Sequence, residues 1–298
     1  MNPAPSAVSL PDFIIIGAMK SATSTLQEQL AQQPGIFMST PKEPNFFSDD
    51  VKYRRGIDWY SSLFSAAPAG DLKGEASTHY TKLPTYGQTI ARMHARVPNA
   101  RLVYVMRHPV DRLVSHYIHE WSMGKIHCGI NDAVRQFPEL IAYGEYSVQL
   151  APYFESYGHD RILPVFFDRL TRAPQAELER VCRFIGYRAK PGWIEEMKPS
   201  NVSSERLRRF PLYDLVVKSA LATNLRRSFV PRNLRDWIKG RLTMKQRPQL
   251  DPATIKDIEG RFDRDLERLG GWLGRELNCE NFKELTGSTE LNWSPRHD

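Results

Sequence analysis

The stretch FIIIGAMKSATSTLQEQL, residues 13–30, decides the fold. Its apolar start, Phe13–Ile16, predicts a buried strand, and Gly17 allows a tight turn directly after it. Residues Ser24–Gln33 have the apolar spacing of a helix. A strand that runs through a glycine and a lysine into a Ser/Thr-rich helix start is typical of an anion-binding loop.

The same alternation of strand and helix recurs twice. The apolar run Leu102–Met106 precedes a helical pattern at about 110–121, and Ile162–Phe167 precedes another at about 174–185. Such alternation predicts parallel strands with helices on both faces. We therefore expect the α/β class, as a P-loop-like three-layer fold with a central, mostly parallel sheet flanked by helices.

The chain of 298 residues is long enough for one large α/β domain. Because no linker is apparent, we place a single domain at residues 12–285, between a flexible N-terminus (1–11) and a tail (286–298). No apolar run approaches the roughly 18 residues that span a bilayer. No signal peptide is visible, and the three cysteines form no metal-type spacing. These features predict a cytoplasmic protein.

Positive charge is concentrated between Lys218 and Arg247. This segment has nine basic residues and one acid, Asp236, and accounts for the whole net charge of +7. Since the rest is near neutral, a nucleic-acid partner is not favoured. Apolar residues of 234–242 fall on one helical face, which packing against the domain would explain. The alternative is a mobile lid that recruits an anionic acceptor or contacts an anionic membrane surface.

The two loops that follow predicted strands suit an anionic ligand. In parallel sheets ligands bind at the carboxyl ends of strands, where the loops 17–25 and 107–115 fall. Nucleotide triphosphatases place a glycine before the loop lysine and use an acid to hold magnesium. Here Ala-Met precedes Lys20, and the strand 102–106 ends in Arg107. The pattern favours polyanion binding without a metal, although the Ser/Thr run could also be only an N-cap cluster.

Three stretches resemble one family, the sulfotransferases that use 3′-phosphoadenosine 5′-phosphosulfate (PAPS). GAMKSATSTL (17–26) looks like their 5′-phosphosulfate loop, and LVYVMRHPVDRLVSHY (102–117) resembles their 3′-phosphate motif. PKEPNFFSD (41–49) is similar to a segment of the heparan-sulfate-type branch. Softer matches follow in the family's order, so that the resemblance spans most of residues 12–280. It implies PAPS as co-substrate, adenosine 3′,5′-bisphosphate (PAP) as product, and no required metal.

The resemblance also implies roles for individual residues. Lys20 would contact the oxygen that bridges phosphate and sulfate, and Arg107 with Ser115 would bind the 3′-phosphate. The 5′-phosphate would be held by Ser21, Ala22, Thr23, Ser24 and Thr25. Arg206 and Arg208 stand as the counterpart of the branch's late K-G-R-x-Y-P cofactor loop. Trp193 is a candidate to stack on the adenine, or else a core or surface aromatic.

On the acceptor side, the resemblance implies Glu43 as the general base, with His79 as a second candidate. Without the resemblance, Glu43 reads as an ion-pair partner of Lys42 or an exposed loop acid. Residues 75–80, EASTHY, resemble the branch's E-K-[ST]-P-x-Y, but the lysine is Ala76. That difference argues against a sulfated glycosaminoglycan acceptor. We expect transfer to a hydroxyl of a small molecule, carbohydrate or glycolipid.

Two other functions stay open at this point. A P-loop kinase-like phosphotransferase would bind magnesium–ATP and need an acid where Arg107 stands. A non-catalytic nucleotide-binding or polyanion-binding module would function without Lys20 and Glu43.

Overall fold

A computed structural model describes residues 9–196, 244 and 246–294. Its strands form one five-stranded sheet in the order β2-β3-β1-β4-β5, and every neighbouring pair is parallel. The strands are β1 Phe13–Gly17, β2 Ile36–Met38, β3 Leu72–Ala76, β4 Arg101–Met106 and β5 Ile162–Phe166. The prediction of a central parallel sheet is confirmed.

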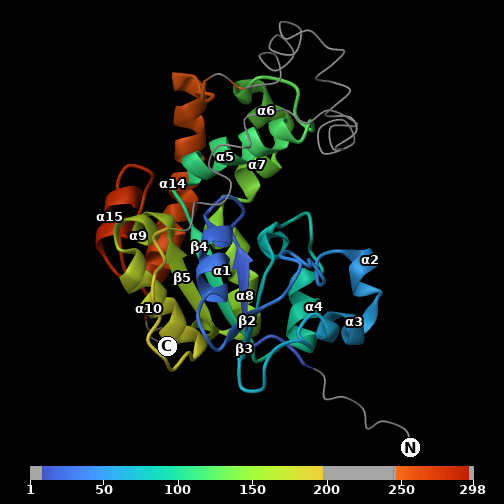
Figure 1. Cartoon of the computed structure of the whole chain (residues 1–298). Coiled ribbons are helices and arrows are strands. Elements are labelled where there is room, and N and C mark those ends of the chain that lie inside the picture. The colour runs from blue at the N-terminus through green and yellow to red at the C-terminus, as the bar shows by residue number, and fades with distance from the viewer. Residues whose placement is uncertain (1–8, 197–243, 245, 295–298) are drawn as a thin grey trace, which may run out of the picture.

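Helices lie on both sides of this sheet (Figure 1). The first are α1 Thr23–Ala31, α2 Asp50–Tyr53, α3 Gly56–Ser62, α4 Thr89–Arg96, α5 Pro109–Ser122, α6 Ile130–Gln136 and α7 Glu139–Ala142. They continue with α8 Tyr146–Tyr157, α9 Phe167–Arg172, α10 Pro174–Ile185, α14 Pro252–Leu273 and α15 Phe282–Ser288. Two short 3-10 helices complete the described elements, η1 Thr78–Thr81 and η2 His159–Arg161. The predicted helices at 24–33, 110–121 and 174–185 correspond to α1, α5 and α10.

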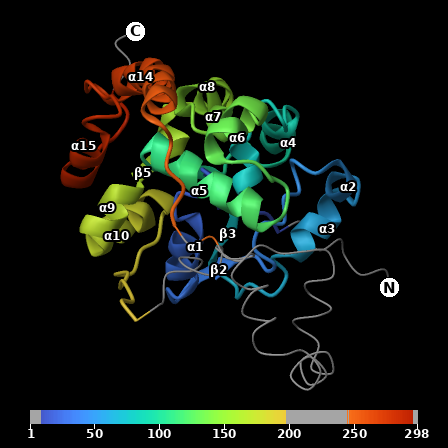
Figure 2. The ribbon, with the colours of Figure 1, turned by 90° about the horizontal axis from the view of Figure 1, so that it is seen from above.

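Alternation along β1 explains the three layers. Ile14 and Ile16 point into one apolar cluster, which also contains buried residues of α4, α5, α8 and α14. Phe13 and Ile15 point into a second cluster, with residues of α1 and α10. A strand that is buried on both faces has a continuous apolar sequence, as β1 does. Figure 2, seen from above, shows α1 and α10 on one side of the sheet and α8 and α14 on the other.

The chain reverses its direction of travel across the sheet at β1. It first builds β2 and β3 on one side of β1, then β4 and β5 on the other. In open α/β sheets, ligands bind at the carboxyl ends of strands beside such a switch point. Gly17 ends β1 there, and a Cβ at this position would lie 1.9 Å from Thr81 Oγ1. Only glycine therefore fits the start of this loop.

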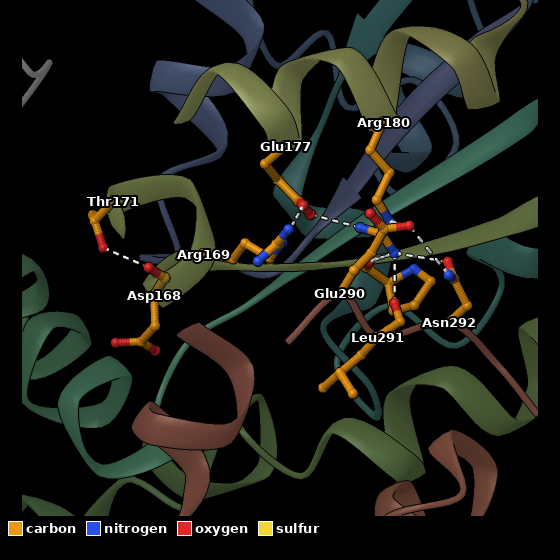
Figure 3. A network of polar contacts seen from close by, with 9 residues as sticks. Asp168, Arg169, Thr171, Glu177, Arg180, Glu290, Leu291 and Asn292 are labelled. Carbon is orange, nitrogen blue, oxygen red and sulfur yellow. Dashed lines mark hydrogen bonds and ion pairs between the residues drawn. The ribbon is translucent and has the colours of Figure 1, made fainter. Parts of the chain in front are cut away.

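A buried polar network holds strand β5 and the two helices that follow it in place (Figure 3). Arg180 of α10 forms an ion pair with Glu177 at 2.6 Å and donates to the carbonyls of Pro164 and Leu291 at 2.8 and 2.6 Å. Arg169 of α9 lies 3.3 Å from the second Glu177 oxygen. Removing one partner of such a buried pair typically costs about 3–5 kcal/mol. The network thereby ties β5, α9 and α10 to the segment after α15.

Two sequence-based predictions fall outside the described residues. Arg206 and Arg208 lie in the range 197–243, and so does most of the basic segment 218–247, including its predicted helical face. Among the described residues, no helix combines the length and apolar character needed to cross a membrane.

Candidate active site

One cavity of about 750 Å³ opens at the carboxyl edge of the sheet. The segments that follow all five strands contribute to its wall. The predicted site residues that line it are Lys20, Ala22, Thr23, Ser24, Thr25, Glu43, His79, Arg107 and Ser115. Ser21 is fully buried next to them. The structure thus brings residues from four separate stretches of sequence into one space.

The loop after β1 is shaped by left-handed backbone. Lys20 has φ 70° and Ala22, the N-cap of α1, has φ 68°. Non-glycine residues in this conformation are strained and cluster at functional sites. The turn places the first turn of α1, Thr23 to Thr25, on the cavity wall. Free amides and the positive end of the helix dipole there attract an anion.

Arg107, which follows β4, reaches across to this loop. Its Nη1 donates to the carbonyl of Lys20 at 3.4 Å, and the guanidinium lies 4.5 Å from the centre of the Phe167 ring. Tyr146 holds its backbone by donating to the carbonyl at 2.5 Å. Burial lowers the pKa of Arg107, and its buried Nε has no hydrogen-bond partner in the part of the chain that the structure describes. An unsatisfied guanidinium nitrogen at a cavity wall fits an anionic ligand.

Arg247 is a second arginine at this end of the cavity. Its Nη2 lies 3.4 Å from Asp111, which also pairs with Lys283 at 2.7 Å. In sequence, Lys245-Gln246-Arg247 also contains the lysine and arginine of the K-G-R pattern. Arg206 and Arg208, which we predict as the counterpart of that pattern, lie outside the described residues.

Glu43 faces the cavity from the segment after β2. Its amide donates to the carbonyl of Ala76 at the end of β3 at 3.0 Å, and its backbone is left-handed with φ 55°. Thr78 Oγ1 donates to the carboxylate at 3.1 Å. Lys42 Nζ lies 3.9 Å from the same oxygen and also donates to the hydroxyl of Ser24. Lys42 therefore links the acid to the loop after β1.

A buried network below Glu43 holds this segment in place. Ser77 donates to Glu75 Oε1 at 2.6 Å and accepts the backbone amide of Asn45 at 3.0 Å. Tyr60 donates to the other oxygen of Glu75. Burial raises the pKa of Glu75, and the hydrogen bonds from Ser77 and Tyr60 oppose that rise. The first residue of EASTHY is thus a support for the Glu43 segment and not part of the cavity wall.

His79 and Lys82, from the segment after β3, also line the cavity. The His79 ring is stacked on Tyr86, with 4.8 Å between centroids. Burial, followed by the charge of Lys82, lowers the pKa of His79 to about 4. The Lys82 side chain is also buried, and burial lowers its pKa to about 8 against the attraction of Glu43. Lys82 was not predicted, since it belongs to none of the sequence motifs.

Trp193 also lines the cavity, while it packs against the cluster under α1 and α10. Its packing against this cluster agrees with a core or surface aromatic, and stacking on the adenine stays a prediction.

Comparison with known proteins places these features in a family. The family model described as "Sulfotransferase domain" matches residues 10–270. The chain belongs to the sulfotransferase family, and the resemblance carried by its three motifs is confirmed. The crystal structure of a sulfotransferase from Alicyclobacillus acidocaldarius has the same fold. Its TM-score is 0.63 at 24% identity, and the match covers 91% of this chain and 98% of that one.

Curated relatives match over shorter stretches. Heparan sulfate glucosamine 3-O-sulfotransferase 3B1 of Mus musculus is 30% identical over 196 residues, which are 59% of this chain and 46% of the relative. The membrane-associated sulfotransferase kil1 of Dictyostelium discoideum is 36% identical over 111 residues, which are 36% of this chain and 22% of the relative. The chain spans less than half the length of these relatives.

Proposed function

We propose that the protein, as a single sulfotransferase domain, transfers the sulfuryl group of PAPS to an acceptor hydroxyl. One observation carries the proposal: Lys20, Arg107 and the Glu43 carboxylate line the same cavity. Cations at one end suit a nucleotide with phosphate at both its 3′ and 5′ positions. A carboxylate at the other end suits the deprotonation of a hydroxyl. The family match supports the same reaction.

In the proposed reaction, some residues bind the nucleotide and others act on the transferred group and the acceptor. Thr23, Ser24 and Thr25 bind the 5′-phosphate through hydroxyls and amides, while Arg107 and Ser115 bind the 3′-phosphate. Arg247 adds charge on that side. The acceptor oxygen forms a bond to sulfur as the bond from sulfur to the 5′-phosphate oxygen breaks. Glu43 takes the hydroxyl proton, and Lys20 stabilises the charge that develops on the leaving phosphate.

His79 fits the role of base less well than Glu43. A histidine with a pKa of about 4 is neutral at pH 7 but is a weak proton acceptor. Its ring stacks on Tyr86, whereas the Glu43 carboxylate lies beside Lys42, which donates to Ser24 of the phosphate-binding loop. The acceptor we propose is a small molecule, carbohydrate or glycolipid with a free hydroxyl.

Ligand binding separates this function from the alternatives. We expect PAP, without metal, to raise the melting temperature clearly, since a ligand at 100 times its Kd stabilises by about 2.7 kcal/mol. Magnesium–ATP should have little effect. The reverse pattern would favour a kinase-like phosphotransferase. Binding of PAP without transfer of label from ³⁵S-PAPS to any of a broad acceptor panel would favour a non-catalytic module.

A further inference from the structure

A second cavity of about 380 Å³ adjoins the first, and His79 lines both. Its wall is formed by residues 48–50 at the start of α2, residues 85–88 before α4, and Arg92. The first of these segments follows Glu43 by only a few residues. The space therefore extends the part of the active-site cavity around Glu43 and His79, which we call the acceptor end, and not the part around Lys20 and Arg107, which we call the phosphate-binding end.

The boundary between the two cavities is a pair of flat rings. His79 and Tyr86 stack with an interplanar angle of 14°. Because burial keeps the imidazole neutral at pH 7, the pair offers uncharged ring surface with polar atoms at its edges. A surface of this kind packs well against a ligand that has both C–H faces and hydroxyl edges.

The charges of the second cavity do not suit an anion. Its cation, Arg92, is already engaged: it lies 2.6 Å from Asp50, donates to the carbonyl of Phe47 at 3.3 Å, and covers the Tyr53 ring at 4.5 Å. Asp49 and Asp50 also stand on the wall, where Asp50 is paired with Arg92 and Asp49 accepts the backbone amides of Val51 and Lys52. An anionic ligand would meet no unengaged cation among the described residues of this wall, whereas hydroxyl groups can donate to the carboxylate oxygens.

We propose that the second cavity is an acceptor subsite that binds an uncharged, hydroxyl-rich sugar unit next to the unit whose hydroxyl faces Glu43. The inference rests on the proposed function and narrows its acceptor to a neutral glycan of more than one unit. In this arrangement His79 positions the acceptor by stacking and does not take its proton.

Filling the second cavity tests the subsite. Gly87 lines the second cavity, and a Cβ there has only the Pro84 carbonyl oxygen nearby, at 3.9 Å, so Gly87→Trp adds a large side chain at this wall without a clash at Cβ. Gly271→Trp in α14 is the matched control, since nothing lies within 4 Å of its added Cβ. The probes are p-nitrophenyl glycosides of one and of four neutral hexose or N-acetylhexosamine units and a sulfated heparin tetrasaccharide, each assayed with ³⁵S-PAPS.

We expect the neutral tetrasaccharide to have a KM at least about tenfold below that of the monosaccharide in the wild type and in Gly271→Trp, a gain of about 1.4 kcal/mol. In Gly87→Trp the ratio should fall to about one. Calorimetry with PAP checks that each variant is folded. Should Gly87→Trp not fold, Gln88→Lys at the same wall should shift preference several-fold toward the sulfated tetrasaccharide.

Several results would overturn the subsite. These are a length advantage that survives Gly87→Trp, no length advantage in the wild type, preference of the wild type for the sulfated probe, or an unchanged preference in Gln88→Lys. Binding of PAP with no transfer to any glycoside would also reject it and leave the proposed sulfotransferase function standing. Failure to bind PAP would instead reject the proposed function.

Discussion

The two ends of the active-site cavity are built by different means. At the phosphate-binding end, left-handed backbone at Lys20 and Ala22 and the start of α1 present amides and hydroxyls, with Arg107 beside them. At the acceptor end, side chains of both signs, Glu43 and Lys82, line the cavity, and a buried polar network supports the left-handed segment that carries Glu43. A backbone-built site holds one fixed ligand, whereas a side-chain-built site can change its ligand with few substitutions. The comparison predicts that mutations at the two ends separate binding from turnover.

The largest expected effect is on turnover at the acceptor end. Glu43→Gln keeps the shape of the side chain and removes the base, so kcat should fall by about 10²–10⁴-fold while PAP affinity changes little. The measurement is steady-state transfer from ³⁵S-PAPS together with calorimetry of PAP. His79→Ala is the matched variant and should lower kcat much less. Near wild-type turnover in Glu43→Gln, with loss in His79→Ala, would transfer the role of base to His79.

At the phosphate-binding end the expected loss is in affinity. Arg107→Ala removes a charge-assisted contact worth about 1.5–3 kcal/mol, so PAP should bind about 10–100-fold more weakly. Adenosine 5′-monophosphate lacks the 3′-phosphate, and its affinity should change far less. Calorimetry with both nucleotides measures the difference. Arg161→Ala is the control, since this half-buried arginine donates to the carbonyl of Asn99 and does not line the cavity. Equal loss for both nucleotides would contradict a contact to the 3′-phosphate.

The sequence predicted which residues of the two loops come together at this end of the cavity, because their determinants are local. The loop 17–25 and the loop 107–115 each follow an apolar run, and parallel strands bring both to one edge of the sheet. The family resemblance then supplied Glu43. Even the contact between Arg107 and the carbonyl of Lys20 follows from β1 and β4 being neighbours.

Strand β3 shows why the rest was missed. Its sequence, LKGEA, has no apolar run. A Cβ on Gly74 would nevertheless lie 2.2 Å from the Phe13 side chain, and the buried Glu75 carboxylate accepts hydrogen bonds from Tyr60 and Ser77. Tertiary contacts, not strand propensity, make this segment a strand. Lys82 was missed for the same reason, because the groups around it, which include Glu43, Glu120 and the Tyr143 ring, come from segments distant in sequence.

A buried lysine at the acceptor end should cost stability. Below pH 8 both folded and unfolded chains carry the Lys82 charge, and the folded state bears the cost of burying it. Above pH 8 the folded state loses the proton first, because its pKa is lowered from 10.5 to about 8, and the cost fades. Lys82→Met should therefore be more stable than wild type at pH 7, by about 1–2 kcal/mol, with a smaller advantage at pH 10.

Urea unfolding at both pH values measures this effect. Lys125→Met is the control, because the Lys125 side chain is 66% exposed and its pair with Glu120 should contribute little. A stability gain that does not change with pH, or a less stable Lys82→Met at pH 7, would contradict a stability cost from burying the Lys82 charge.

The smallest expected effect concerns Arg247, and it tests how far the phosphate-binding end extends along the chain. This side chain is 49% exposed and already faces Asp111 at 3.4 Å, so a bound 3′-phosphate must share it. Arg247→Ala should weaken PAP binding by less than about tenfold, or under about 1.4 kcal/mol. As with Arg107→Ala, adenosine 5′-monophosphate should be nearly unaffected. The loss should shrink as salt rises, since a half-exposed charge is screened. A loss that is equal for both nucleotides and insensitive to salt would show that Arg247 only braces α5 through Asp111.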